Sequence, residues 1–205
     1  MASDLNSSFP STVHAEVVKA SGLIAAGSRP GSTRLIQDSY VARWGDVTVS
    51  GEKLLIPYRH YDAADVPSFN SHSVLAAWMT RAHDGHVREL AVRSLLSHPT
   101  KLWHPPYVIQ LLGEYVVEIC EVISDYVMRV LPLDPVAANA YQSFWVANPQ
   151  FITLTRSRAA SYWAAYHWRS SPWLSYPGRS ALDSIERLGR DMAVADDRTA
   201  QNQPC

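Results

Sequence analysis

The stretch HDGHVRELAVRSLL, residues 83–96, decides how the rest of the chain is interpreted. Its apolar residues Val87, Ala91 and Leu95 recur at the spacing of one face of an α-helix, with charged residues between them. Asp84 stands in front of this segment, and aspartate is favoured at helix starts because its carboxylate accepts backbone N–H bonds, which stabilises a helix by ~1 kcal/mol. The stretch therefore predicts an amphipathic helix that begins directly after Asp84.

The same periodicity begins at Ser71 and predicts a predominantly α-helical domain over residues 71–192. Asp134-Pro135 and Asn148-Pro149 each place a capping residue before a proline, a pair that is typical of a helix start. The expected helical segments are residues 74–79, 87–95, 108–112, 116–130, 151–168 and 182–188.

Residues 13–70 form an N-terminal segment, in which a helix is expected over 13–26 and a β-hairpin over about 46–58. Apolar and polar residues alternate on both sides of the turn Ser50-Gly51-Glu52, which is the period of a strand. Pro57 removes a ladder donor and favours a sheet edge for the return strand. Residues 40–44 are a candidate third strand, and the polar ends, residues 1–12 and 193–205, are interpreted as frayed tails.

Composition excludes several classes of protein. The 205 residues are 47% hydrophobic and 18% charged, which is typical of a globular domain, and the net charge of −1 disfavours nucleic acid as a partner. The apolar-rich segment 107–131 contains four acidic residues, too many for a membrane span, and the first residues lack the features of a signal peptide. Cys120 and Cys205 fit neither a disulfide framework nor a zinc site. We therefore expect a soluble cytoplasmic protein with no cofactor.

The turns that precede the predicted helices recur along the chain. Asp84, Glu114 and Asn148 are 30 and 34 residues apart. A period of this length predicts stacked helical hairpins, each of which buries its apolar face against its neighbours.

These hairpins resemble HEAT-type repeats. Asp84, the Val87-Arg88 pair and the following small residue and leucine are similar to the second helix of such a repeat, and SVLAAWMTRAH before them is similar to the first. LLGEYVVEICEVI resembles a second unit, although Glu118 replaces the arginine, and NPQFITLTRSRAA resembles a third, with Ile152 at that position. The units cover about residues 71–168. The segments IPYRHY and LLGEYVVEI are also similar to parts of uncharacterised bacterial proteins, which implies no activity.

The HEAT-type resemblance implies a curved helical stack that holds a partner, usually another protein, without catalysis. Two surfaces are candidates for that contact. The first is an acidic helix face with 4-3-4 spacing, and its residues are Glu114, Glu118, Glu121 and Asp125. The second is a dense aromatic–arginine region, and its residues are Arg156, Arg158, Tyr162, Trp163, Tyr166 and His167. The alternative interpretations are a solvated acidic face and ordinary core aromatics, and the sequence leaves the oligomeric state open, including a homo-oligomer.

A rival hypothesis is a metal-dependent phosphohydrolase. The segment AHDGH is similar to the signature of the HD-type family, in which histidines and a His-Asp pair hold a divalent metal that activates water, but it lacks one residue between the aspartate and the glycine. The alternative metal ligands are His83, Asp84, His60 or His72 upstream, and Asp125 downstream. An interaction module without catalytic residues remains the favoured interpretation, because the sequence has no nucleophile elbow, no phosphate-binding glycine loop and no Glu-x-x-His pair for a di-metal site.

Overall fold

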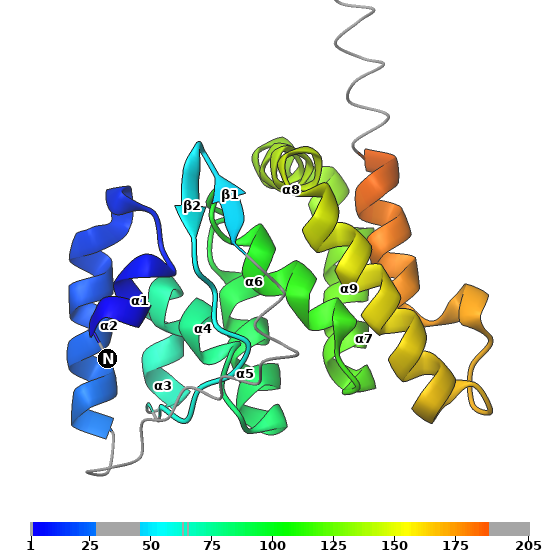
Figure 1. The fold of residues 1–205 in the computed structure, drawn as a ribbon, viewed down its shortest axis with the longest axis horizontal. Coiled ribbons are helices and arrows are strands. Elements are labelled where there is room, and N and C mark those ends of the chain that lie inside the picture. The colour runs from blue at the N-terminus through cyan, green and yellow to red at the C-terminus, as the bar shows by residue number, and fades with distance from the viewer. Residues whose placement is uncertain (1, 28–45, 63, 65, 189–205) are drawn as a thin grey trace, which may run out of the picture.

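The computed structural model describes residues 2–27, 46–62, 64 and 66–188 (Figure 1). It confirms a mainly α-helical chain with a small antiparallel β-hairpin. Within these residues, no helix has the length and the apolar character that crossing a bilayer requires. The predicted strand at residues 40–44 and the predicted tail at residues 193–205 lie outside the described residues.

The described N-terminal residues are folded, so the expectation of a frayed tail over residues 1–12 is wrong for residues 2–12. Leu5 and Phe9 are buried in the core, and the hydroxyl of Tyr107 donates a hydrogen bond to the carbonyl of Ser8. Local pattern missed this because two isolated apolar side chains give no periodic signal, and their partners lie far along the chain. The elements here are α1 (Ala2–Ser7), the short 3-10 helix η1 (Ser11–Val13) and α2 (His14–Gly27).

Strands β1 (Val47–Val49) and β2 (Glu52–Leu54) form the hairpin. Val49 pairs with Glu52, so Ser50 and Gly51 make a two-residue turn. Their φ values of 51° and 83° are those of the type I′ turn that matches the twist of a hairpin. The return strand is shorter than predicted: it ends at Leu54, which pairs with Val47, the first residue of β1, and the N–H of Leu55 bonds to the carbonyl of Ser7.

Asp84 begins α5 as the sequence predicts. Its carboxylate accepts hydrogen bonds from the backbone N–H groups of His86 and Val87, at 2.8 and 3.5 Å. The helix before it is buried on all sides, since every side chain from Val74 to Met79 lies in the core. The elements here are α3 (Val66–Phe69), α4 (Ser73–Met79) and α5 (Gly85–Ser97).

The next helical region is broken at the point where the sequence placed an acidic face. Residues Gln110–Gly113 form a 3-10 helix, η3, and Glu114 follows it in an extended conformation. The long helix begins only at Val117, so the prediction that Glu114 shares one helix face with three later acids is wrong. The elements are α6 (Pro105–Ile109), η3, α7 (Val117–Arg129) and η4 (Leu131–Leu133).

Both predicted proline-marked helix starts occur, but only one is capped by its side chain. Asp134 accepts N–H bonds from Val136 and Ala137, both at 3.0 Å. The Asn148 amide bonds instead to the backbone of Thr48, accepting at 2.7 Å and donating at 2.9 Å, and so fastens the hairpin to the corner between two helices. The elements are α8 (Pro135–Ala147), α9 (Pro149–Tyr162), a π-helical turn η5 (Trp163–His167), η6 (Trp173–Ser175) and a last helix over residues 177–188.

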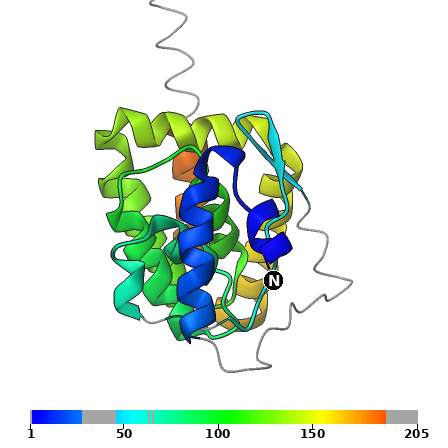
Figure 2. The same cartoon turned by 90° about the vertical axis from the view of Figure 1, so that its left-hand side faces the viewer.

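The elements follow one another along the long axis of the molecule, from α1 and α2 at one end to α9 and the last helix at the other (Figure 1). Figure 2 shows α2 covering one end, with α8 running across its direction. Helix α4 packs against α5, α5 against α7, and α9 against η3, around one continuous apolar core. Whether these layers are HEAT repeats stays a prediction.

Candidate functional site

The four predicted acidic residues separate into two environments. Glu118, Glu121 and Asp125 are exposed on α7. Glu114 is 1% exposed and lies among three buried arginines. It cannot contact a partner as predicted, because it precedes the helix and points into the interior.

The buried cluster joins four separate segments through Glu114. Its Oε2 atom lies 2.7 Å from Arg59 Nη2 and 2.9 Å from Arg88 Nε, and its Oε1 atom lies 3.5 Å from Arg81 Nη1. Arg88 also donates to the carbonyls of Ala82 and His83, at 3.0 and 2.8 Å. The cluster therefore fixes the start of α5 against the end of η3 and the segment that follows the hairpin.

Burial and neighbouring charges shift the pKa values of this cluster in opposite directions. Burial alone would raise the pKa of Glu114, but the charges of Arg59, Arg81 and Arg88 outweigh it and hold the pKa below its usual value. Burial lowers the pKa of Arg81 to about 9, although the charge of Glu114 opposes that shift. Glu114 is therefore ionised, and its removal would leave three guanidinium groups in the interior without their carboxylate.

The exposed acids line a groove between α5 and α7. The groove has a volume of about 610 Å³, and its carboxylates come from Glu89 on α5 and from Glu118, Glu121 and Asp125 on α7. Arg93 also lines the groove, where it pairs with Glu89 at 2.9 Å. The apolar part of the wall consists of Leu96, Val122, Tyr126 and Val130. The structure thus brings three predicted residues into one concave acidic surface with Glu89, which was not predicted.

Part of the predicted aromatic–arginine region is structural. Arg156 bridges α9 to the last helix, pairing with Asp183 and Glu186 at 2.7 Å each. Trp163 is half-buried, and its indole donates to the carbonyl of Ser171 at 2.8 Å while its ring packs against Trp173. These two side chains hold the C-terminal segment on the rest of the fold.

The remaining residues of that region surround an exposed tyrosine cluster. The rings of Tyr115, Tyr162 and Tyr166 lie with centroids 6.0 to 6.4 Å apart, and Tyr166 is 67% exposed. Arg158 donates to the Tyr162 hydroxyl at 3.0 Å, and the His167 ring bonds to the Tyr115 carbonyl at 3.1 Å. Tyr115, which no sequence pattern indicated, lies between Glu114 and the start of α7.

The candidate metal ligands are held in other roles. Both ring nitrogens of His60 are engaged: Nε2 is 2.8 Å from the carbonyl of Trp78, and Nδ1 accepts from the N–H of Asp62 at 3.2 Å. Asp84 caps α5, and Asp125 lies on α7, paired with Arg129 at 2.6 Å. Over the described part of the chain, no three His, Cys, Asp or Glu residues are placed to hold a metal ion.

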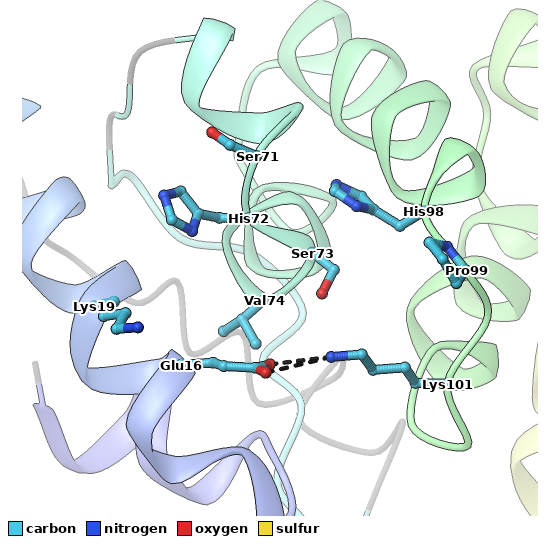
Figure 3. A pocket seen from close by; sticks show the side chains of 9 residues that line it. All are labelled: Glu16, Lys19, Ser71, His72, Ser73, Val74, His98, Pro99 and Lys101. Carbon is cyan, nitrogen blue, oxygen red and sulfur yellow. Dashed lines mark hydrogen bonds and ion pairs between the residues drawn. The ribbon is translucent and has the colours of Figure 1, made fainter.

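The other candidate histidine lies in a different pocket, shown in Figure 3. His72 is there with Lys19 of α2 and with His98 at the end of α5, around a volume of about 430 Å³. Lys101 binds the carboxylate of Glu16 across this pocket at 3.2 Å (Figure 3). The pocket that contains His83 and Asp84 has a different lining, which does not include His72.

Comparison of the chain with models of protein families, with curated proteins and with solved structures gives no match. The sequence offered one indication of the buried cluster. Arg59 belongs to IPYRHY and Glu114 to LLGEYVVEI, the two segments that are similar to parts of uncharacterised bacterial proteins. Nothing in either segment indicated that they pair.

Proposed function

We propose that this protein is a non-catalytic interaction module that binds a basic segment of a partner protein in the groove between α5 and α7. The observation that carries the proposal is the charge of that groove. Two of its four carboxylates, Asp125 and Glu89, have arginine partners. Glu118 and Glu121 form no ion pair with any residue that the structure describes, and both face solvent.

Charge complementarity decides which class of partner fits. A groove with four carboxylates, two of them without an ion-pair partner among the described residues, attracts lysine and arginine and repels an acidic segment, which favours specificity and fast association. The apolar wall accepts the apolar side of the same segment, as in helix-in-groove recognition. The exposed tyrosine cluster offers a further contact surface, because tyrosine is enriched where proteins bind each other.

A defined pair of peptides tests this proposal. We expect a fluorescein-labelled amphipathic peptide of lysine and leucine to bind, and a matched peptide of glutamate and leucine not to bind. Glu118→Lys should lower the affinity for the lysine peptide at least tenfold, because it reverses a charge inside the groove. Fluorescence anisotropy measures this affinity. Raising the salt from 50 to 300 mM should also weaken binding, since exposed charges are screened.

Asp46→Lys is the matched control. It makes the same change of charge at an exposed position that does not line the groove, so it should alter binding less than twofold. Equal losses in the two variants would show a response to net charge alone and would reject the groove. Failure of the lysine peptide to bind the wild-type chain would reject it as well.

A further inference from the structure

A second, smaller pocket lies where the segment after the hairpin meets the end of α4 and the start of α5. Its volume is about 290 Å³, close to the lower end of the range for small-molecule sites. Its polar lining is provided by His60, Tyr61, Asp62, His83 and Asp84. It shares no residue with the acidic groove between α5 and α7.

Asp62 is the unusual residue of this pocket. It is only 8% exposed, and its Oδ2 atom accepts a hydrogen bond from the Trp78 indole at 2.8 Å. The Oδ1 atom is buried and has no hydrogen-bond partner among the described residues. A buried carboxylate oxygen without a donor is costly, so this oxygen is suited to accept a hydrogen bond from a bound ligand.

The charge of the pocket favours a cationic donor. None of its lining residues is lysine or arginine. Arg59 and Arg81, which are close enough to His60 to influence it, direct their guanidinium groups to Glu114. Asp84 adds a second carboxylate at the rim, where Oδ1 caps α5.

An aromatic wall completes the site. The ring of Tyr61 packs on His83 with centroids 4.6 Å apart, and Tyr61 is 40% exposed, so one side of it is open to a ligand. Ala64, Met79 and Val87 supply apolar surface for the carbon atoms of a ligand. A carboxylate beside an aromatic face is the arrangement that stabilises ammonium and guanidinium groups.

We propose that this pocket binds one organic cation, an ammonium or guanidinium group that donates to Asp62 Oδ1 and lies against Tyr61. An organic cation fits better than a metal ion because the lone pair of His60 Nδ1 is already occupied by the N–H of Asp62. The cation comes either from a free small molecule or from a lysine or arginine side chain. This inference stands independently of the groove proposal.

Two-dimensional ¹H–¹⁵N NMR of the full chain tests the inference. The indole N–H of Trp78 bonds to Asp62, so its resonance reports directly on that carboxylate. Titration with agmatine should shift it saturably, whereas neutral N-butylurea should not. The peptide acetyl-Gly-Arg-Gly-amide distinguishes the two sources: tighter binding of the peptide indicates a partner side chain, and tighter binding of agmatine indicates a small molecule.

Asp62→Asn should weaken agmatine binding at least tenfold. The asparagine carbonyl can still accept from Trp78, so the fold should persist. Asp46→Asn makes the same chemical change at an exposed position outside both the pocket and the groove, and should leave agmatine binding unaltered. Tyr61→Ala gives an independent measure, an expected loss of agmatine affinity of about threefold. Its control is Trp168→Ala, which removes an exposed ring outside both the pocket and the groove. The inference is rejected if no cation shifts the Trp78 resonance, or if Asp62→Asn and Asp46→Asn bind agmatine equally.

Discussion

Glu114 and the three acids of α7 have similar spacing in the sequence and opposite positions in the structure. Glu114 is enclosed by Arg59, Arg81 and Arg88. Glu118, Glu121 and Asp125 face solvent along the α5–α7 groove. The residue type and the local spacing do not distinguish them.

The difference shows how strongly environment changes the role of a carboxylate. In the interior, an ion pair must offset the large cost of removing each charge from water, so the arrangement has to be complete. At the surface, water already solvates the charge, and a carboxylate contributes little to stability. The buried cluster is therefore sensitive to any change, while the exposed acids are available for binding.

The largest predicted effect separates these two environments. Glu114→Gln should lower the free energy of unfolding by about 3–5 kcal/mol, because three buried guanidinium groups lose their carboxylate. Urea denaturation followed by circular dichroism measures this. Glu118→Gln, the same change on α7, should alter stability by less than about 0.5 kcal/mol. Similar losses for both variants would contradict the assignment of distinct environments.

The second-largest predicted effect is a decrease in the free energy of unfolding in mild acid. Burial lowers the pKa of His60 to about 4 and that of His104 to about 3, from 6.5. Below pH 6.5 these two histidines are protonated in the unfolded chain but stay neutral in the folded chain. The free energy of unfolding is therefore highest above pH 6.5 and decreases as the pH falls toward 4. Each histidine should contribute about 1 kcal/mol per pH unit.

Below the usual pKa of 4.5, Glu114 adds to this loss, because its lowered pKa means that its stabilising contribution disappears as the pH falls further. Urea denaturation at a series of pH values measures the loss of stability in both pH ranges, that of the histidines and that of Glu114. His104→Asn should roughly halve the slope between pH 6 and 5. An unchanged slope in that variant would show that another group titrates there.

The smallest effect on stability concerns an exposed carboxylate that stabilises only the helix start beside it. Asp84→Ala should cost about 1 kcal/mol, because two backbone N–H groups at the start of α5 lose their acceptor. Asp134→Ala, at the equivalent position of α8, should cost a similar amount. Thermal unfolding compares the two. A loss at Asp84 several times larger than at Asp134 would indicate a role beyond capping.

Much of the fold was predictable because its signals are local. The helix start at Asp84 and the turn at Ser50-Gly51 depend on hydrogen bonds and backbone angles within a few residues. The acidic face of α7 was also predictable, since charged and apolar residues alternate with helical period. The signals that failed were those with a distant partner, such as the burial of Phe9 against Tyr107 and the bonding of Asn148 to Thr48.

The same limit applies to the candidate sites. Aromatic spacing identified Tyr162 and Tyr166, but Tyr115, which completes their cluster, comes from a different element. Trp163 has the same sequence character as its neighbours and is nevertheless half-buried, because its indole binds Ser171. Asp62 carried no signal at all, since the missing donor at its Oδ1 atom depends on how three segments meet.

The sequence alone determined most of the helices, the caps at Asp84 and Asp134, and the hairpin, because hydrophobic periodicity and backbone hydrogen bonding act over a few residues. Only the tertiary structure decided which charges are buried and which remain in water. Those positions depend on electrostatic and desolvation energies between residues such as Arg59 and Glu114, which are 55 positions apart in the sequence and 2.7 Å apart in the fold.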